Sequence, residues 1–168
     1  HQDAIYFSKR VTRAVPDGGF IEAHTDLVKK LDYECELAVV LGRDAKDVPA
    51  GQTKEFVFGY TILNDVSARD VQTAHKQWYF GKSLDGFTPI GPCIVTADEF
   101  ADYPPRLGIR SFVNGEKRQD SNTGLQIFDI DHVLHELSQG MTLKAGTLIA
   151  TGTPAGVGMG MDPPQFLV

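Results

Sequence analysis

The feature that most constrains the fold is a hydrophobic run over residues 31–42, LDYECELAVVLG, which carries two glutamates in its first half. From Leu37 to Leu41 every residue is apolar, which is typical of a central strand covered on both faces. Because side chains alternate between the faces of a strand, Glu34 and Glu36 should share one face, separated by about 6.6 Å of rise. The sequence therefore predicts two carboxylates at the edge of a buried core.

Two ionised carboxylates held close together in a low-dielectric setting repel each other, and one pKa rises unless a positive charge lies between them. A hard divalent cation removes this conflict, because its oxygen ligands lie at roughly 2.0–2.6 Å and side chains rooted about 6–7 Å apart can converge on it. Mg²⁺, Mn²⁺ or Ca²⁺ would fit. The alternative is that Glu34 and Glu36 lie at a solvated start of the strand, which is the commoner arrangement for an isolated E-x-E pair.

Length and composition bound the class of protein. With 168 residues and 42% hydrophobic residues, the chain fits one domain over residues 1–168. The net charge of −6 argues against a nucleic-acid partner and against an anionic membrane surface. No apolar run approaches the roughly 18 residues of a membrane span. Cys35 and Cys93 sit in apolar contexts and are expected to be buried, reduced thiols, so we expect a cytoplasmic protein.

Short strands separated by Gly and Pro turns dominate the rest of the chain. Asn114-Gly115 suits the tight turn of a hairpin between residues 109–113 and 116–119. Helices are predicted over residues 67–77 and 130–137, the second with apolar residues at helical spacing. Other strands are expected at 5–7 and 11–15 as a hairpin, and at 20–24, 56–63, 88–95 and 148–150. This pattern predicts an α+β domain that is mainly β, and no phosphate-binding glycine loop is present.

Further polar residues follow the strand predicted over 56–63. Asp65 comes directly after it, and Arg69 and Gln72 follow at i+4 and i+7, so a metal held by Asp65 would have a guanidinium and an amide nearby. Taken alone, such an aspartate more often caps a turn. Lys82 lies in a Gly-Lys-Ser turn ringed by aromatic residues, so we expect it to be partly desolvated and paired with a carboxylate, for which Asp85 is a candidate, or with a bound anion.

Six segments together resemble the fumarylacetoacetate hydrolase family, over about residues 31–158. They are LDYECELAVVLG at 31–42, GYTILNDVSARDVQ at 59–72, GKSLD at 81–85, PIGP at 89–92, VNGE at 113–116 and TGTPAGVG at 151–158. The resemblance implies a mixed β-sandwich roll, a homodimer, and an enzyme that binds Mg²⁺ or Mn²⁺, with Ca²⁺ as a further ion that the site accepts.

The resemblance also implies roles for individual residues. The family's metal ligands correspond to Glu34, Glu36 and Asp65. Its substrate contacts correspond to Arg69, Gln72, Lys82 and Thr153, and among these we expect Lys82 to act in catalysis by placing positive charge beside the substrate.

Two features of the family are not found in this sequence. Family members carry, upstream, an Asn-Tyr-x-x-His-x-x-Glu segment whose His and Glu form a general acid/base pair on a mobile lid. The strands that close the fold after the Gly-Val-Gly loop are missing as well. We therefore expect residues 1–168 to be a single catalytic domain of a longer protein with a lid and a C-terminal tail. An intact mass above that of these residues would support this, and an equal mass would contradict it.

The leading functional hypothesis is a divalent-metal enzyme that acts on a small anionic 2-oxo or 1,3-dioxo carboxylic acid through a metal-stabilised enolate. Acylpyruvate C–C hydrolysis, oxaloacetate decarboxylation and keto–enol or double-bond isomerisation all share this chemistry and stay open. Two other classes remain. A metal-independent glycoside hydrolase could use Glu34 and Glu36 as acid and nucleophile, and a non-catalytic binding protein could hold a structural Ca²⁺ with the same three acids.

Overall fold

The computed structural model describes residues 2–168, and its centre is an antiparallel four-stranded sheet with the order β5-β3-β2-β8. Strand β2 (Cys35–Leu41) lies between β3 (Val57–Asn64) and β8 (Leu148–Ala150), and β5 (Ile90–Thr96) lies beyond β3. All seven residues of β2 are buried. The apolar run therefore forms the central strand that the sequence predicts.

Within residues 2–168, two smaller sheets and three short helices complete the fold. Strand β1 (Leu31–Asp32) pairs with β4 (Ser67–Ala68), and β6 (Gly108–Val113) forms a hairpin with β7 (Glu116–Asn122). The helices are α1 (Arg69–Ala74), α2 (Tyr79–Lys82) and α3 (Ile130–Ser138), with 3₁₀ turns η1 (Thr53–Phe56), η2 (Ala97–Glu99), η3 (Thr123–Leu125) and η4 (Gly158–Gly160).

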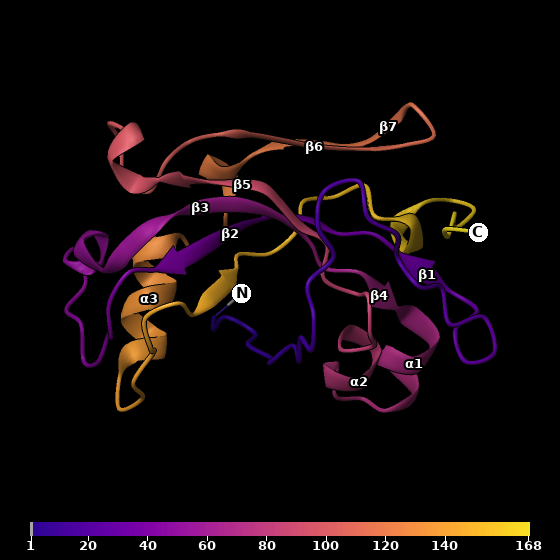
Figure 1. The fold of residues 1–168 in the computed structure, drawn as a ribbon, viewed down its shortest axis with the longest axis horizontal. Helices are drawn as coiled ribbons and strands as arrows, with labels where there is room; N and C mark the ends of the chain where they lie inside the picture. Colours follow the sequence, from indigo (N-terminus) through magenta and orange to yellow (C-terminus); the bar gives the residue numbers. More distant parts are fainter. Residues whose placement is uncertain (1) are drawn as a thin grey trace.

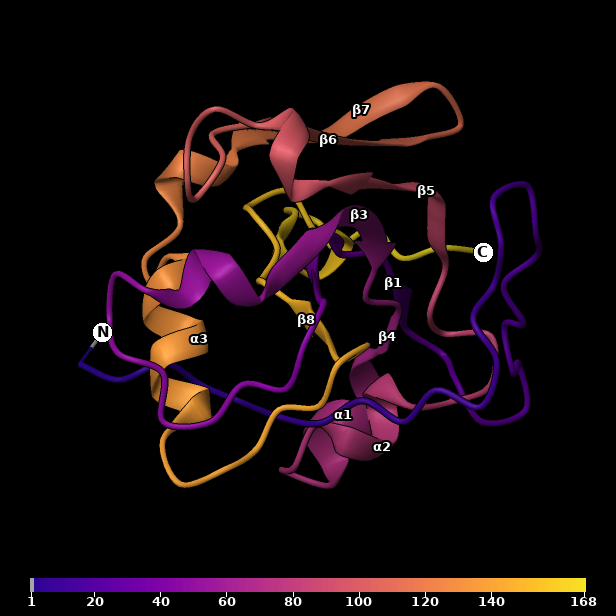
Figure 2. The same cartoon turned by 60° about the vertical axis from the view of Figure 1, so that its left-hand side comes forward.

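The elements are arranged in layers around this sheet. Helix α3 lies on one side of β2 and β3, and the β6–β7 hairpin lies on the opposite side (Figure 1). Helices α1 and α2 lie side by side at the end of the molecule away from α3 (Figures 1 and 2). The carboxylate-bearing end of β2 therefore points towards the α1–α2 pair.

Two hydrophobic clusters hold the layers together. The larger one packs Leu37, Val39 and Leu41 of β2 against Ile130 and Leu134 of α3. Full burial of each aliphatic side chain of this size contributes about 1.5–3 kcal/mol. The smaller cluster joins β1, β4 and α1 through Leu31, Val66, Ala68, Val71 and Phe87. It anchors α1 next to the start of β2.

Most of the predicted elements are confirmed. The strands at 56–63, 88–95 and 148–150 correspond to β3, β5 and β8, and the hairpin turns at Asn114 and Gly115, which both have positive φ. Helix α3 forms where the apolar spacing predicts it, with the Asp129 carboxylate accepting a hydrogen bond from the His132 backbone N–H at 2.9 Å. The fold class, an α+β domain that is mainly β, is confirmed.

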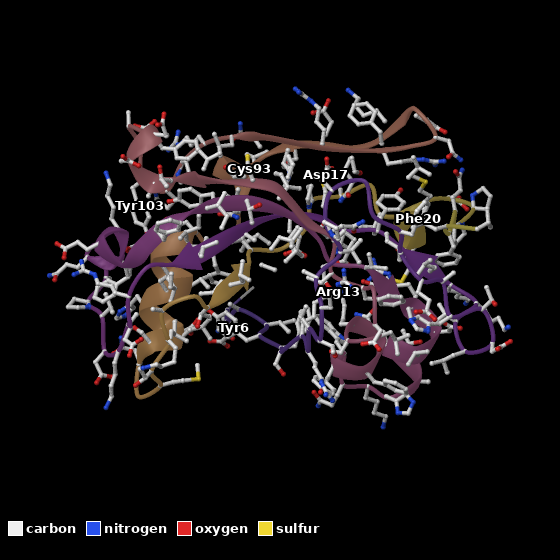
Figure 3. All side chains as sticks on the ribbon, in the orientation of Figure 1. Tyr6, Arg13, Asp17, Phe20, Cys93 and Tyr103 are labelled. Carbon is white, nitrogen blue, oxygen red and sulfur yellow. The ribbon has the colours of Figure 1, made fainter. Side chains whose placement is uncertain are left out.

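The strands predicted at 5–7, 11–15 and 20–24 are wrong. In the described chain these residues form no strand, and their backbone joins a sheet only through a single bridge between Val15 and Pro89. The N-terminal segment runs past α3 and then past α1 and α2, where helices offer no strand edge to pair with (Figure 2). Side chains attach it instead: Tyr6 lies beside α3 and donates a hydrogen bond to Glu136 (Figure 3).

The cysteine prediction is half right. Cys35 is a buried free thiol in β2, but Cys93 is exposed, because β5 is an edge strand and the middle of this strand faces solvent. Burial raises the pKa of the Cys35 thiol. Within residues 2–168 none of the helices combines the length and the apolar character needed to cross a membrane. The cytoplasmic location stays a prediction.

Candidate metal centre and substrate site

The three acidic residues singled out in the sequence lie together. One carboxylate oxygen from each of Glu34, Glu36 and Asp65 lies within 4.8 Å of the others. Glu34 directly precedes β2, Glu36 lies on it, and Asp65 directly follows β3. The antiparallel register pairs Cys35 with Asn64, and the Asp65 backbone N–H donates to the Glu34 carbonyl at 2.8 Å. The backbone of two neighbouring strands therefore sets the positions of all three acids.

These carboxylates are not at a solvated end of the strand. Glu34, Glu36 and Asp65 are 8%, 3% and 1% exposed. The alternative that the glutamates point into solvent is therefore wrong. Buried charges of one sign need compensation from cations or from hydrogen-bond donors.

Lys82 supplies part of that compensation from α2. Its Nζ lies 2.8 Å from Glu34 Oε2 and 2.7 Å from Asp65 Oδ2, and the side chain is buried. The predicted burial is confirmed, but the suggested partner Asp85 is wrong, since the ammonium pairs with the acidic cluster. Gly81 makes this possible, because a Cβ at that position would lie 2.6 Å from the Gln72 backbone nitrogen and would push α2 away from α1.

Arg69 reaches the same cluster from the first residue of α1. Its Nη1 lies 2.6 Å from Glu34 Oε1 and donates to Gln72 Oε1 at 3.2 Å. Its Nη2 is buried and has no hydrogen-bond partner among residues 2–168. Arg69 and Gln72 lie on one face of α1, whereas Asp65 precedes the helix, in the turn between β3 and β4. An unpartnered buried donor on a side chain that contacts the acidic cluster is a group available to a ligand.

Thr153 lies in the loop that follows β8. Its hydroxyl donates to the Cys35 carbonyl at 3.0 Å and accepts from Gln119 Nε2 at 2.7 Å. The neighbouring Gly152 backbone N–H donates to Glu36 Oε2 at 2.7 Å. The loop that carries Thr153 is therefore tied directly to the acidic cluster, and the role of Thr153 as a substrate contact stays a prediction.

Three residues of the site were missed by the sequence reasoning. Lys9 Nζ lies 2.8 Å from Asp65 Oδ1 and also donates to the Val66 and Lys82 carbonyls. Burial lowers the pKa of Lys9, and the Asp65 carboxylate partly opposes this. Nothing in the local sequence of Lys9 indicates this contact. Asp32 and Gln119 do have recognisable sequence features. Asp32 is a third acid inside the 31–42 run, and Gln119 is a polar residue on the strand after the Asn-Gly turn.

The charges of the cluster are unevenly distributed. Lys9, Lys82 and Arg69 contact Glu34 or Asp65, whereas Glu36 receives a hydrogen bond only from the Gly152 backbone among residues 2–168. Burial, followed by the neighbouring Asp65 carboxylate, raises the pKa of Glu36 to about 8. A divalent cation would relieve this excess of negative charge, and three carboxylates that converge through oxygen are a donor set that such a cation prefers. The residues present fit a bound metal.

The raised pKa of Glu36 predicts the pH dependence of stability in the metal-free protein. The folded chain retains the Glu36 proton up to about pH 8, whereas the unfolded chain loses it near 4.5. Between these values the folded state binds more protons, so the free energy of unfolding should fall as the pH rises. Denaturant unfolding in EDTA should show this fall, and Glu36→Gln should remove it. An identical slope in both proteins would contradict the assignment.

A mainly β domain with a buried carboxylate cluster, flanked by two lysines and an arginine, belongs to the class of β-rich proteins whose acidic site could hold a divalent cation. The chain belongs to the fumarylacetoacetate (FAA) hydrolase C-terminal family, whose family model matches residues 1–168. The resemblance inferred from the six sequence segments is thereby confirmed.

Named relatives support this assignment. The chain is 45% identical over 161 residues to the oxaloacetate tautomerase YisK of Bacillus subtilis, covering 96% of the chain and 53% of that protein. The structure of a fumarylacetoacetate hydrolase from Exiguobacterium antarcticum matches with 51% identity and a TM-score of 0.85, over 92% of the chain and 54% of that structure. A fumarylpyruvate hydrolase from Pseudomonas aeruginosa, in complex with Mn²⁺ and pyruvate, matches with 33% identity and a TM-score of 0.77, over 86% and 64%. The chain spans 53%, 54% and 64% of the length of these three proteins.

Proposed function

We propose that this chain forms the catalytic part of a divalent-metal enzyme that enolises small anionic 2-oxo acids. One arrangement carries the proposal: Glu34, Glu36 and Asp65 converge in a buried site where Lys82 contacts two of them and Arg69 Nη2 lacks a partner. The three carboxylates would hold Mg²⁺ or Mn²⁺. When bound, the ion supplies a Lewis acid for the negative charge that develops on the substrate oxygens.

The residues of the chain would bind and orient the substrate. Arg69 would donate from Nη2 to the substrate carboxylate, and Gln72 would hold the guanidinium through its Nη1 hydrogen bond. Lys82 would place its ammonium beside the developing charge in a site that excludes most water. Thr153 would contact the other end of the substrate. These cations explain how a chain with a net charge of −6 could attract an anionic substrate.

Within this class we propose keto–enol tautomerisation of oxaloacetate as the first candidate reaction. The first support is the 45% identity to a protein named oxaloacetate tautomerase. The second is that tautomerisation needs stabilisation of negative charge and no covalent nucleophile, which suits a site of three converging carboxylates that could hold a cation. Hydrolysis of an acylpyruvate is the second candidate. It is favoured by the likeness to a fumarylpyruvate hydrolase and by the pyruvate and Mn²⁺ in the complex of that enzyme.

The two other classes of function receive less support. A glycoside hydrolase would use Glu34 and Glu36 as a separate pair, but Asp65 and Lys82 lie within the same cluster. A structural Ca²⁺ site needs no unpartnered guanidinium nitrogen beside it. Family membership points away from both.

The test is to assay the purified protein with oxaloacetate and with fumarylpyruvate, each with Mg²⁺, with Mn²⁺ and after EDTA treatment. The enol and keto forms of oxaloacetate are followed by ultraviolet absorbance. We expect metal-dependent acceleration of tautomerisation above the buffer rate. Acceleration only with fumarylpyruvate would select the second candidate. No acceleration with either compound, or full activity after chelation, would contradict the proposed function.

We also expect the protein to form a homodimer, which is the arrangement implied by the sequence resemblance. Sedimentation at micromolar concentration should give twice the mass of the chain. A monomer alone under these conditions would contradict this prediction.

A further inference from the structure

Asp32 is a buried acid outside the predicted ligand set. Its side chain is fully buried, and both of its oxygens accept hydrogen bonds. Oδ1 accepts from the backbone N–H groups of Tyr33 at 2.9 Å and Gly158 at 2.7 Å. Oδ2 accepts from the Met159 backbone N–H at 2.9 Å and from Arg69 Nε at 2.9 Å. Four donors therefore converge on one carboxylate.

These hydrogen bonds connect three segments that are distant in the sequence. Asp32 ends β1, Arg69 begins α1, and Gly158 and Met159 lie at the start of η4. The contact is tight at Gly158, where a Cβ would lie 2.7 Å from Asp32 Oδ1 and 2.1 Å from the Gln165 carbonyl oxygen. The carboxylate is thus held on a fixed backbone frame and can in turn fix the group that it binds.

The group it binds is the guanidinium at the candidate substrate site. Asp32 holds Arg69 Nε, while Glu34 and Gln72 hold Nη1. Because the guanidinium is planar, contacts at two nitrogens fix the direction of the third. Nη2 is that third nitrogen, and it is the one without a partner among residues 2–168.

We infer that Asp32 is a positioning residue that fixes the Arg69 guanidinium so that Nη2 faces the substrate carboxylate. The inference rests on the proposed function, because it concerns the same substrate site. In the described chain Asp32 makes no hydrogen bond with any of the three proposed metal ligands. Its link to the candidate substrate site therefore runs through Arg69.

The chemistry of the contact requires an ionised carboxylate. All four partners are donors, so an amide at this position would direct its NH₂ group at one pair of them. Asp32→Asn keeps the shape but should release or rotate the guanidinium. We expect KM for oxaloacetate to rise about 10–100-fold, the range typical of lost outer-shell partners. We expect kcat to change less than about threefold and Mn²⁺ affinity to stay within about twofold, since the ligands are untouched.

Asp70→Asn is the matched control. Asp70 neighbours Arg69 on α1, and its carboxylate accepts a backbone hydrogen bond from Lys29 at 2.8 Å, without contacting the cluster. The Asp70→Asn substitution should leave KM for oxaloacetate unchanged. A double-mutant cycle adds Arg69→Lys: if Asp32 acts through Arg69, Asp32→Asn should add less than about twofold to the loss in kcat/KM in that background. Full additivity, or an equal KM effect in the Asp70→Asn control, would overturn the inference.

A measurement on the unmodified protein covers the case in which Asp32→Asn does not fold. Arginine side-chain NMR with Mg²⁺ should show a slowly exchanging Arg69 Nε–H signal, which is assigned by its loss in Arg69→Lys. Addition of pyruvate should leave this Nε–H signal in place and shift the Arg69 Nη signals. An Arg69 Nε–H that exchanges freely with water would overturn the inference. Pyruvate binding is independent of turnover, so absence of turnover with an intact Nε–H signal would count against the proposed function alone.

Discussion

Glu36→Gln should lower the affinity for Mg²⁺ and Mn²⁺ by more than about 100-fold, a larger loss than removal of an outer-shell partner causes. Glu36 is the one carboxylate of the cluster that no lysine or arginine contacts among residues 2–168, so its charge is the one most available to a cation. The glutamine keeps the side-chain shape and can still accept the hydrogen bond from the Gly152 backbone. The substitution thus removes the charge that Glu36 gains when metal binding releases its proton, with little change in packing.

Calorimetric titration with each metal at pH 7.5 measures this loss. Glu99→Gln is the control, because it removes the same charge from an exposed position in η2. It should bind both metals as the unmodified protein does. Unchanged Mg²⁺ affinity in Glu36→Gln would show that the three acids are not the metal site, and the proposed function would lose its main support.

The central part of the fold and the acidic cluster could be predicted because both depend on short-range patterns. Alternation along the 31–42 run places Glu34 and Glu36 together, and an antiparallel partner strand ending at Asn64 brings Asp65 next to them. Helix α3 follows from apolar spacing, and the β6–β7 hairpin follows from Asn-Gly. For these elements the information lies within the element itself, whereas the membership of Asp65 in the cluster depends on the pairing of β2 with β3 and was expected from the family resemblance.

The residues that were missed depend on contacts between distant segments. Lys9 reaches Asp65 from a segment with no regular structure, and side-chain contacts such as the edge-on packing of Phe7 against Trp78 hold this segment in place. Strand propensity in residues 5–7 has no effect there, because β pairing requires an available strand edge. Asp32 acquires its role from α1 and η4 together, and no local pattern specifies that meeting.

Lys82→Met should reduce kcat by about 10²–10³, comparable to the loss of one electrostatic donor in a catalytic site. The Lys82 side chain is 2% exposed, and its Nζ lies 5.4 Å from the centre of the Phe7 ring. In such surroundings a positive charge acts on a nearby anion with little screening by water. Methionine keeps most of the aliphatic stem and removes the charge, so the loss in kcat measures the ammonium.

Metal binding should persist in the same variant. The Lys82 ammonium contacts Glu34 Oε2 and Asp65 Oδ2, oxygens that a bound cation would also attract, so its removal takes away a competitor for two proposed ligands. Kinetics should be measured with metal present, because the metal-free variant leaves two buried carboxylates less well compensated. Lys144→Met, at an exposed lysine paired with Asp44, is the control and should retain full activity. If Lys82→Met instead has the kcat/KM of the unmodified protein with oxaloacetate and with fumarylpyruvate, then the buried lysine stabilises the acidic cluster and takes no part in the reaction.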